Sequence, residues 1–506
     1  MMSFWETYLR EPVRKALLRV LILTEKQTES KPVTRAEGIL RRDIHIPPVI
    51  VAALSTGMFL IVLLMQFGWS LRSLASMTIF SLMILALFVF YLKQDFPKLI
   101  EDDESTALLG TLAVLFALLI GALKGWPVSF YLTPLPAAGI LATLLLHARL
   151  SIILTIILSI LMAMVQHFSL ESFFFSFLGC MAGTASAVYI RNRRDFVRAG
   201  SLIAAVNLLT LTSWSVFRAE PLSHFLWESL WSIANGFISA VLALGMLPFL
   251  ESFFSRVTPM KLLELSDFNQ PLLKRLMVEA PGTYHHSLMM ATLAESAAEA
   301  IGANTLLCRV GAYYHDIGKL VKPEYFIENQ GSIGYNPHKD LAPALSSLVV
   351  ISHVKEGIAL AKAARLPQEI INFITMHHGT SRIEYFYHRA KEEAQEEFFA
   401  DESGTADMEV GEDNYRYSGP KPQSKETAIL MMADSVEAAA RTIEEPTHLR
   451  FKELVEKLVG KKFADGQLGD SPLTLADLDA IQNAFTNTLT SIYHARIEYP
   501  DEEAGA

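Results

Sequence analysis

The feature that most constrains the fold is an almost unbroken apolar stretch that runs from Val49 to Leu250. A helix needs about 20 apolar residues to cross the hydrocarbon core of a bilayer, and this stretch is long enough to do so many times. We therefore expect residues 49–250 to form a transmembrane helical bundle of about eight spans, near 49–69, 73–92, 107–123, 128–147, 150–167, 172–190, 197–217 and 227–250.

The basic residues around these segments predict the orientation of the bundle. Lysine and arginine are enriched in the short loops on the cytoplasmic side of membrane spans. If the basic arm at residues 1–48 is cytoplasmic, the same side receives most of the basic loop residues, namely Lys93, Lys98, Arg149, Arg191, Arg193 and Arg194. Eight spans then return the chain to the cytoplasm. The arm itself fits either a flexible segment or an amphipathic helix on the membrane surface between Pro12 and Thr24.

Beyond the bundle the chain becomes more acidic. After a linker at 251–269, residues 270–500 show helical patterns and almost no strand signals, so the expected fold class is all-α: a multi-span bundle followed by a cytoplasmic helical domain. Its helices are expected near 270–302, 304–319, 341–365, 367–378, 424–459 and 473–495. Residues 390–413 are acidic and poor in apolar side chains, which predicts a mobile loop. The net charge of −10 argues against a nucleic-acid polymer as partner.

The helical domain contains histidines and aspartates that suit metal binding. The adjacent pair His315 and Asp316 ends an apolar helical pattern, and the other members recur on separate predicted helices: His286, His353, His377, His378 and Asp434. Neutral imidazole with carboxylate suits divalent first-row metals such as Mn, Fe or Zn. The chain has two cysteines, too few for a zinc-finger site. A single histidine in such a place is more often a packing residue, but seven groups in this order favour a metal centre.

The spacing of the central pair predicts two ions rather than one. Adjacent residues of a helix point about 100° apart, so His315 and Asp316 cannot both face one ion squarely. A natural arrangement places His315 on one ion and lets the two oxygens of Asp316 bridge this ion to a second. Paired ions are a recurrent device for hydrolysing phosphoesters. From the residues alone we predict a two-metal phosphohydrolase, with Mn or Fe as the expected ions.

Several runs of the second half match a known family. They are Ala280–Ser287, Tyr314–Lys319, Phe326–Gln330, Asn336–His338, Ser352–Gly357, His377–Thr380, Pro420–Glu426 and Ala433–Ala438. In these runs the chain resembles the HD-domain hydrolases attached to bacterial seven-transmembrane receptors, whose characterised members are cyclic-di-AMP phosphodiesterases. The membrane half resembles that family only in the number and spacing of its spans.

Carried over position by position, the resemblance divides the ligands between two ions. It assigns one ion to His286, His315, Asp316 and Asp434, and the second to Asp316, His353, His377 and His378. It also implies that Lys319 contacts a substrate phosphate, so Asp316 and Lys319 are the expected catalytic residues. The neighbouring His285 is expected outside the ligand set, because the ligand of the family precedes the serine.

The resemblance implies hydrolysis of cyclic-di-AMP to the linear dinucleotide pApA, with a metal-bridging hydroxide as the nucleophile. The expected partners are this cyclic dinucleotide and the lipid bilayer of a bacterial plasma membrane, with the HD domain in the cytoplasm. The oligomeric state is left open, with a homodimer as one candidate.

Two alternative functions remain open at this point. One is hydrolysis of cyclic-di-GMP or another nucleotide, although the Gly-Tyr-Pro tripeptide of HD-GYP phosphodiesterases does not occur and Gly334-Tyr335 is followed by Asn336. The other is a membrane receptor whose HD domain binds nucleotide without catalysis. A transporter is disfavoured, because the expected spans contain no string of charged residues.

Two departures from the family pattern concern regulation. Family members usually carry a large extracellular domain after the first span, whereas here only Gly68 to Arg72 separates the first two expected spans. The second departure is the acidic segment at 390–413, which we expect to cover or regulate the site.

Overall fold

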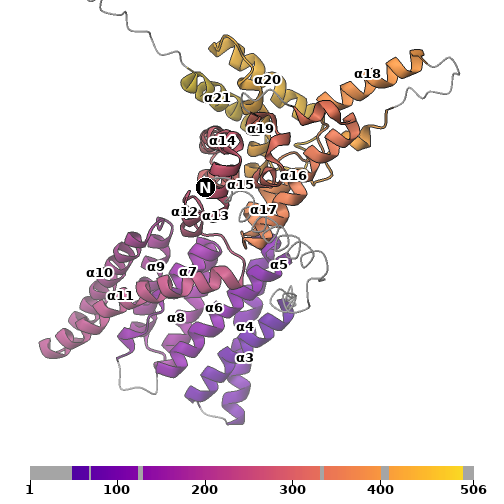
Figure 1. Ribbon diagram of the computed structural model, residues 1–506. Coiled ribbons are helices and arrows are strands. Elements are labelled where there is room, and N and C mark those ends of the chain that lie inside the picture. Colours follow the sequence, from indigo (N-terminus) through magenta and orange to yellow (C-terminus); the bar gives the residue numbers. More distant parts are fainter. Residues whose placement is uncertain (1–47, 68–69, 124–128, 331–335, 401–409, 494–506) are drawn as a thin grey trace, which may run out of the picture. The chain divides into compact units, whose positions relative to one another are not determined.

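The computed structural model describes residues 48–67, 70–123, 129–330, 336–400 and 410–493 (Figure 1). Every regular element among these residues is a helix, and the one β-type pairing is an isolated antiparallel bridge between Arg382 and Arg416. The all-α prediction is confirmed. The chain forms two compact units that divide between Gly121 and Ala122, so the second unit contains apolar helices as well as the acidic C-terminal half.

The first unit consists of apolar helices α3 (Pro48–Phe67), α4 (Leu71–Asp95) and α6 (Asp103–Leu123), with the short α5 (Pro97–Glu101) between the last two. Helix α6 packs closely on α3, because a side chain at Gly110 would overlap Val51. Helix α4 buries only Ser81 and Leu92 within the unit. Its remaining apolar side chains are therefore free to face lipid.

The second unit begins with the 3-10 turn η3 (Phe130–Leu132) and five apolar helices: α7 (Pro136–Leu145), α8 (Ala148–Val165), α9 (Leu170–Ala187), α10 (Arg193–Arg218) and α11 (Leu222–Phe253). Small residues let these helices approach closely, as is common between membrane helices. A Cβ atom at Gly236 of α11 would lie 2.5 Å from the carbonyl oxygen of Gly200 on α10.

Each of the eight expected spans overlaps an apolar helix, and the range 128–147 is divided into η3 and α7. Six helices of the described residues are long and apolar enough to cross a membrane: α4, α6, α8, α10, α11 and α16 (Pro343–Ala363). Helix α16 belongs instead to the C-terminal domain, because it carries Lys355, Glu356 and Lys362 and buries His353. The number of eight spans stays a prediction.

The C-terminal half consists of α12 (Pro259–Leu265), α13 (Pro271–Glu279), α14 (Pro281–Ala300), α15 (Thr305–Tyr314), α16, α17 (Gln368–Met376), α18 (Glu384–Ala400), α19 (Lys425–Ala440), α20 (His448–Ala464) and α21 (Leu475–Ile492). The described residues between these helices include five 3-10 turns: η4 (Ile317–Val321), η5 (Pro323–Tyr325), η6 (Ile327–Asn329), η8 (Pro337–Asp340) and η9 (Glu412–Tyr415). Two apolar cores hold the domain together. One joins α14, α19, α20 and α21, and the other joins α12, α13, α15 and α17.

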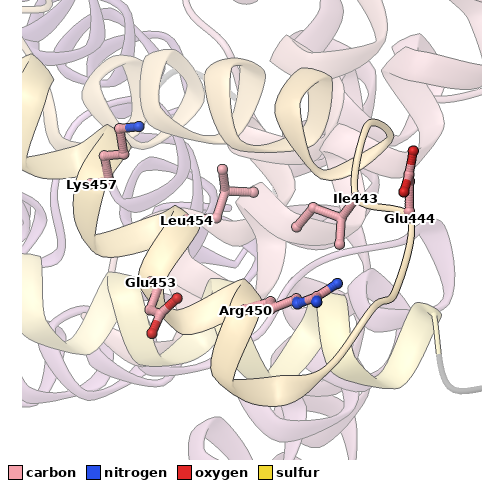
Figure 2. A pocket seen from close by; sticks show the side chains of 6 residues that line it. All are labelled: Ile443, Glu444, Arg450, Glu453, Leu454 and Lys457. Atoms are coloured by element: carbon pink, nitrogen blue, oxygen red, sulfur yellow. The ribbon is translucent and has the colours of Figure 1, made fainter.

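Two helices expected to be continuous are each broken in two. The range 270–302 divides at Ala280, where Pro281 starts α14, because proline is well tolerated in the first turn of a helix and not in its interior. The range 424–459 divides between α19 and α20, where Pro446 lies. A shallow cavity of about 390 Å³ lies at this second break, lined by Ile443, Glu444, Arg450, Glu453, Leu454 and Lys457 (Figure 2).

The prediction of a loop over 390–413 is wrong for its first part. Residues 390–400 continue α18, because glutamate, alanine, lysine and glutamine are good helix formers. Arg389 also pairs with Glu393 one turn later at 2.9 Å, and Ala390 packs against a small core of Phe386, Tyr387 and Tyr415. Residues 401–409 lie outside the described residues, as does the N-terminal arm over residues 1–47.

Candidate metal centre

The structure brings all seven predicted ligands together from five segments of the C-terminal half. His286 lies on α14, His353 on α16 and Asp434 on α19. His315 and Asp316 follow the last residue of α15, and His377 and His378 follow the last residue of α17. The imidazole of the adjacent His285 is exposed, whereas His286 is buried. The cavity beside α20 is lined by none of the seven.

The carboxylate of Asp316 lies at the middle of the cluster. Its Oδ2 atom is 3.1 Å from His315 Nε2 and 3.9 Å from His286 Nε2. Its Oδ1 atom is 3.3 Å from His353 Nε2 and 3.6 Å from His377 Nε2. The two oxygens of one carboxylate therefore face two different groups of histidines, which is the arrangement that a bridging ligand requires.

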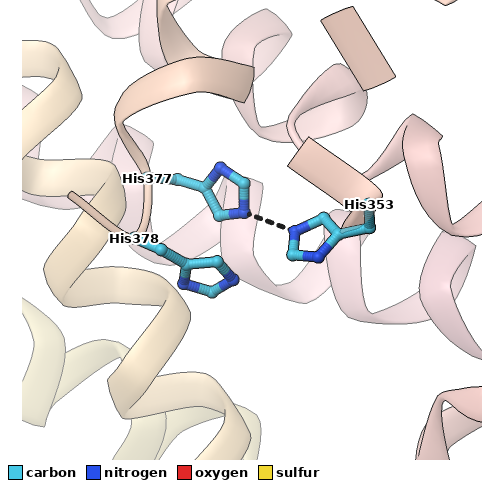
Figure 3. A group of neighbouring side chains, drawn as sticks. All are labelled: His353, His377 and His378. Carbon is cyan, nitrogen blue, oxygen red and sulfur yellow. Dashed lines mark hydrogen bonds between the residues drawn. The ribbon is translucent and has the colours of Figure 1, made fainter. Parts of the chain in front are cut away.

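The ligand atoms fall into two groups of three, each with its members within 4.8 Å of one another. One group is His286, His315 and Asp316, and the other is His353, His377 and His378, whose rings converge in Figure 3. Asp434 lies beside both groups, with Oδ1 3.1 Å from His286 Nε2 and Oδ2 3.5 Å from His378 Nδ1.

Backbone carbonyl groups orient three of the imidazoles. The Nδ1 atoms of His315, His353 and His377 donate to the carbonyl oxygens of Ala312, Val350 and Ile374, at 2.8, 2.5 and 2.8 Å. A carbonyl oxygen only accepts, so the proton of each neutral ring is on Nδ1 and Nε2 presents its lone pair to the cluster. This support is usual for histidines that bind metal.

A carboxylate that the sequence analysis missed orients the fourth imidazole. His286 Nδ1 of α14 donates to Glu437 Oε2 of α19. Arg441 holds Glu437 in place, with Nε 2.7 Å from Oε1. Glu437 is one helical turn after Asp434, a spacing that places both on the same face of α19. This spacing is the feature of the sequence from which a supporting role of Glu437 could have been predicted.

The electrostatics keep most imidazoles neutral and the carboxylates ionised. Burial lowers the pKa of His353 to about 4, and burial also lowers the pKa of His315 and of His378. Burial raises the pKa of Asp316, but its interactions with His315 and Lys319 outweigh this effect and hold that pKa well below its usual range. For His286, hydrogen bonds to Asp434 and Glu437 outweigh burial and raise its pKa to about 9.

Two buried atoms at the cluster have no hydrogen-bond partner among the described residues: His315 Nε2 and Asp316 Oδ1. Leaving such a polar atom buried and unpaired costs about 1–3 kcal/mol, and more when it is charged. A divalent cation in each half of the cluster would satisfy both atoms. The donor set of nitrogen and carboxylate oxygen also suits Mn or Fe, so the residues fit a two-metal centre.

Lys319 is partly enclosed and paired with two carboxylates. Its Nζ atom lies 2.7 Å from Asp316 Oδ2 and 2.7 Å from Glu328 Oε1. Lys319 is therefore not a solvated cation at the surface of the domain. Glu328 is a second residue that the sequence analysis missed.

A close approach of backbones positions the central carboxylate. A side chain at Gly318 would overlap the carbonyl of His353, and a Cβ atom at Gly357 would lie 3.3 Å from the backbone nitrogen of Gly318. Glycine at both positions therefore lets η4 lie directly on α16. This contact brings Asp316 within reach of His353.

The fold and the cluster define a class of protein: an apolar helical bundle joined to a helical domain with an HD-type cluster of histidines and aspartates. Comparison with known families agrees. Residues 71–258 match the family model of the 7TM receptor with intracellular HD hydrolase, and residues 283–439 match that of the HD domain. The chain belongs to this family of membrane receptors with an intracellular HD hydrolase.

Two relatives are cyclic-di-AMP phosphodiesterases named PgpH. The protein of Bacillus subtilis is 40% identical over 379 residues, which are 73% of this chain and 51% of that protein. The protein of Listeria monocytogenes is 34% identical over 442 residues, 85% of this chain and 60% of that protein. The chain thus spans between half and two thirds of the length of these relatives.

Among solved structures, the HD domain of Listeria monocytogenes PgpH in complex with cyclic-di-AMP is similar to this chain. It is 45% identical and covers 45% of this chain and 100% of the solved chain, with a TM-score of 0.41.

Proposed function

We propose that this chain is a membrane-anchored, two-metal phosphodiesterase that hydrolyses cyclic-di-AMP to linear pApA. The observation that carries the proposal is the position of Asp316. Its two oxygens face separate groups of histidines, and Oδ1 has no hydrogen-bond partner among the described residues. Membership of a hydrolase family and two relatives named as cyclic-di-AMP phosphodiesterases support the reaction and the substrate.

The geometry supports the division of the ligands between two ions that the family resemblance implies. His286, His315 and Asp434 would hold one ion, His353, His377 and His378 the other, and Asp316 both. When bound, two such ions neutralise phosphate charge and lower the pKa of a water to supply hydroxide. The Nδ1–carbonyl hydrogen bonds of His315, His353 and His377 leave the Nε2 atoms of these three imidazoles available as ligands.

Lys319 has a defined task in this proposal. It keeps the buried carboxylate of Asp316 ionised and oriented through their 2.7 Å contact. Because its ammonium group lies beside the Asp316 oxygen that faces His286 and His315, a phosphate bound on that side would also lie within its reach. Asp316 and Lys319 are thus the proposed catalytic residues.

The proposed location is a bacterial plasma membrane, with the HD domain in the cytoplasm. Within residues 71–258 the described chain contains seven helices of ten or more residues, namely α4 and α6 to α11, and α3 precedes them. Eight spans place both ends of the bundle on one side. A reporter fused after Arg193 is expected to be cytoplasmic and one fused after Glu220 extracytoplasmic, and the reverse result would contradict this orientation. A homodimer stays a prediction.

The test of the function uses the full chain in detergent micelles, loaded with Mn. We expect cyclic-di-AMP to be converted to pApA faster than cyclic-di-GMP is hydrolysed. His285→Ala serves as a matched control, since this imidazole is exposed and next to a proposed ligand. Faster hydrolysis of cyclic-di-GMP would show that cyclic-di-GMP is the preferred substrate. Binding of either nucleotide without turnover, with metal present, would assign a receptor without catalysis.

A further inference from the structure

The proposed centre is open on one side. The side chains of His315, His377, His353 and Asp316 are 0–2% exposed, whereas His378 is 21% and Asp434 14% exposed. A substrate that rests on the proposed ions therefore has to approach past His378 and Asp434. Groups that border this edge are candidates for binding the substrate.

The end of helix α20 is docked at this edge. Gln467, which follows α20 and is buried, accepts from the backbone N–H of Thr380 at 2.9 Å and donates to the Thr380 hydroxyl at 3.1 Å. Gly379 has φ +52°, a conformation that glycine adopts without strain, and this turn brings Thr380 to Gln467. The docking places Lys462 of α20 over the same turn, where Nζ donates to Ser381 Oγ at 2.9 Å.

Lys462 has no carboxylate of its own, in contrast to three other cations near this edge. Lys461 pairs with Glu384 at 2.9 Å, Arg416 pairs with Glu412 at 2.7 Å, and Lys319 pairs with two carboxylates. Among the described residues Lys462 makes no ion pair, and its hydrogen-bond partner Ser381 is uncharged. It is also partly buried, so its ammonium group has lost part of its water.

The surroundings of Lys462 favour a bound anion. Burial lowers the pKa of Lys462, and the charges of Asp434 and Asp465 only partly offset this effect. A desolvated ammonium group without a counter-ion is costly, and an anion that reaches it removes that cost. The Lys462 charge is compact, which suits a single phosphate oxygen rather than a planar two-point contact.

We propose that Lys462 binds a phosphate oxygen of the phosphodiester substrate at the His378–Asp434 edge of the centre. This inference rests on the proposed function. It adds a positive charge that is in no ion pair among the described residues, whereas Lys319 already divides its charge between Asp316 and Glu328.

The test compares Lys462→Met with Lys461→Met in the full chain, loaded with Mn in detergent micelles. The two lysines are adjacent on α20 and carry the same charge, but Lys461 is 60% exposed and paired with Glu384. Loss of a hydrogen bond to a charged group weakens binding by about 10- to 100-fold. We expect Lys462→Met to raise the KM for cyclic-di-AMP by that factor and to weaken inhibition by inorganic phosphate in parallel. Lys461→Met is expected to change neither, and Lys462→Arg to recover part of the loss.

Metal content and thermal unfolding of each variant separate binding from folding. The proposal expects Lys462→Met to keep the metal content and melting temperature of the wild type. Equal KM values for the two Met variants would overturn it, and so would loss of bound metal in Lys462→Met, since that would assign a structural role. Absence of turnover in the wild type would contradict the proposed function instead. In that case inhibition is replaced by direct titration with inorganic phosphate, and equal affinities for wild type and Lys462→Met would overturn the role of Lys462.

Discussion

Polar side chains are buried in two regions of the second unit, and the two regions use them differently. Among the apolar helices, Glu171 accepts from the hydroxyl of Tyr131 and pairs with Arg218 at 2.7 Å. In the metal centre, by contrast, His315 Nε2 and Asp316 Oδ1 have no hydrogen-bond partner among the described residues. The chain itself supplies the partners of Glu171. The unpaired atoms of His315 and Asp316 instead need a ligand as their partner.

Neutral polar side chains among the apolar helices also find partners within the chain. Asn235 donates to the carbonyl oxygens of Tyr131 and Thr133, at 2.9 and 2.6 Å, and thereby ties η3 to α11. The atoms left unpaired in that region are uncharged, such as Asn207 Oδ1 and Ser232 Oγ. An unpaired neutral oxygen costs far less than an unpaired charge. The comparison therefore assigns a structural role to the first region and a metal-binding role to the second.

The largest effect is expected from Asp316→Asn. A neutral amide cannot bridge two cations, so turnover of cyclic-di-AMP is expected to fall below detection and the metal content to drop. Asp470→Asn is the control, because Asp470 is an exposed carboxylate of the same domain. Normal turnover with full metal content in Asp316→Asn would remove Asp316 from the bridging position.

The place of Asp316 within the cluster was predictable, because the histidines and aspartates on separate helices form a recognisable series in the sequence. The helix breaks at Ala280 and before α20 were not predicted, although Pro281 and Pro446 mark them in the sequence. The helical course of residues 390–400 was not predicted, because an acidic composition suggests a loop. Glu437 and Glu328 were missed for a related reason. A carboxylate close to a motif looks like a solvated surface charge until tertiary packing buries it against His286 or Lys319.

A smaller loss is expected from Glu437→Gln, which keeps the shape of the side chain but removes the charge that orients His286. Changing such a supporting group typically costs 10- to 100-fold in metal affinity or activity. We expect a loss of that size in the affinity for Mn, measured by titration of the metal-free chain. Glu445→Gln is the matched control, because Glu445 is 77% exposed. An unchanged affinity in Glu437→Gln would show that the hydrogen bond to His286 has no supporting role.

Lys319→Ala tests the second proposed catalytic residue. We expect kcat/KM to fall at least tenfold, about 1.4 kcal/mol of transition-state stabilisation, with the metal content retained. A loss mainly in kcat indicates a contact that strengthens in the transition state, and a loss mainly in KM indicates uniform binding. Lys322→Ala, three residues further and exposed, is expected to have no effect. An unchanged kcat/KM in Lys319→Ala would exclude the role in catalysis.

The smallest effect is expected from Glu171→Gln in the apolar region. The substitution removes the ion pair with Arg218 but leaves an amide that still bonds to Tyr131. Polar interactions between membrane helices contribute about 0.6–2 kcal/mol, so we expect a modest decrease in thermal stability in detergent. Turnover and metal content are expected to be unchanged. A loss of metal in this variant would contradict the conclusion that the buried polar groups of the apolar helices are purely structural.

The central claim, that Asp316 joins two ions in one centre, is tested most directly by electron paramagnetic resonance of the Mn-loaded chain. Two Mn ions that share a carboxylate are magnetically coupled, whereas separate ions give independent signals. We predict a coupled pair with two Mn bound per wild-type chain, and loss of the coupling in Asp316→Asn. A single, uncoupled Mn per wild-type chain at saturation would contradict the account.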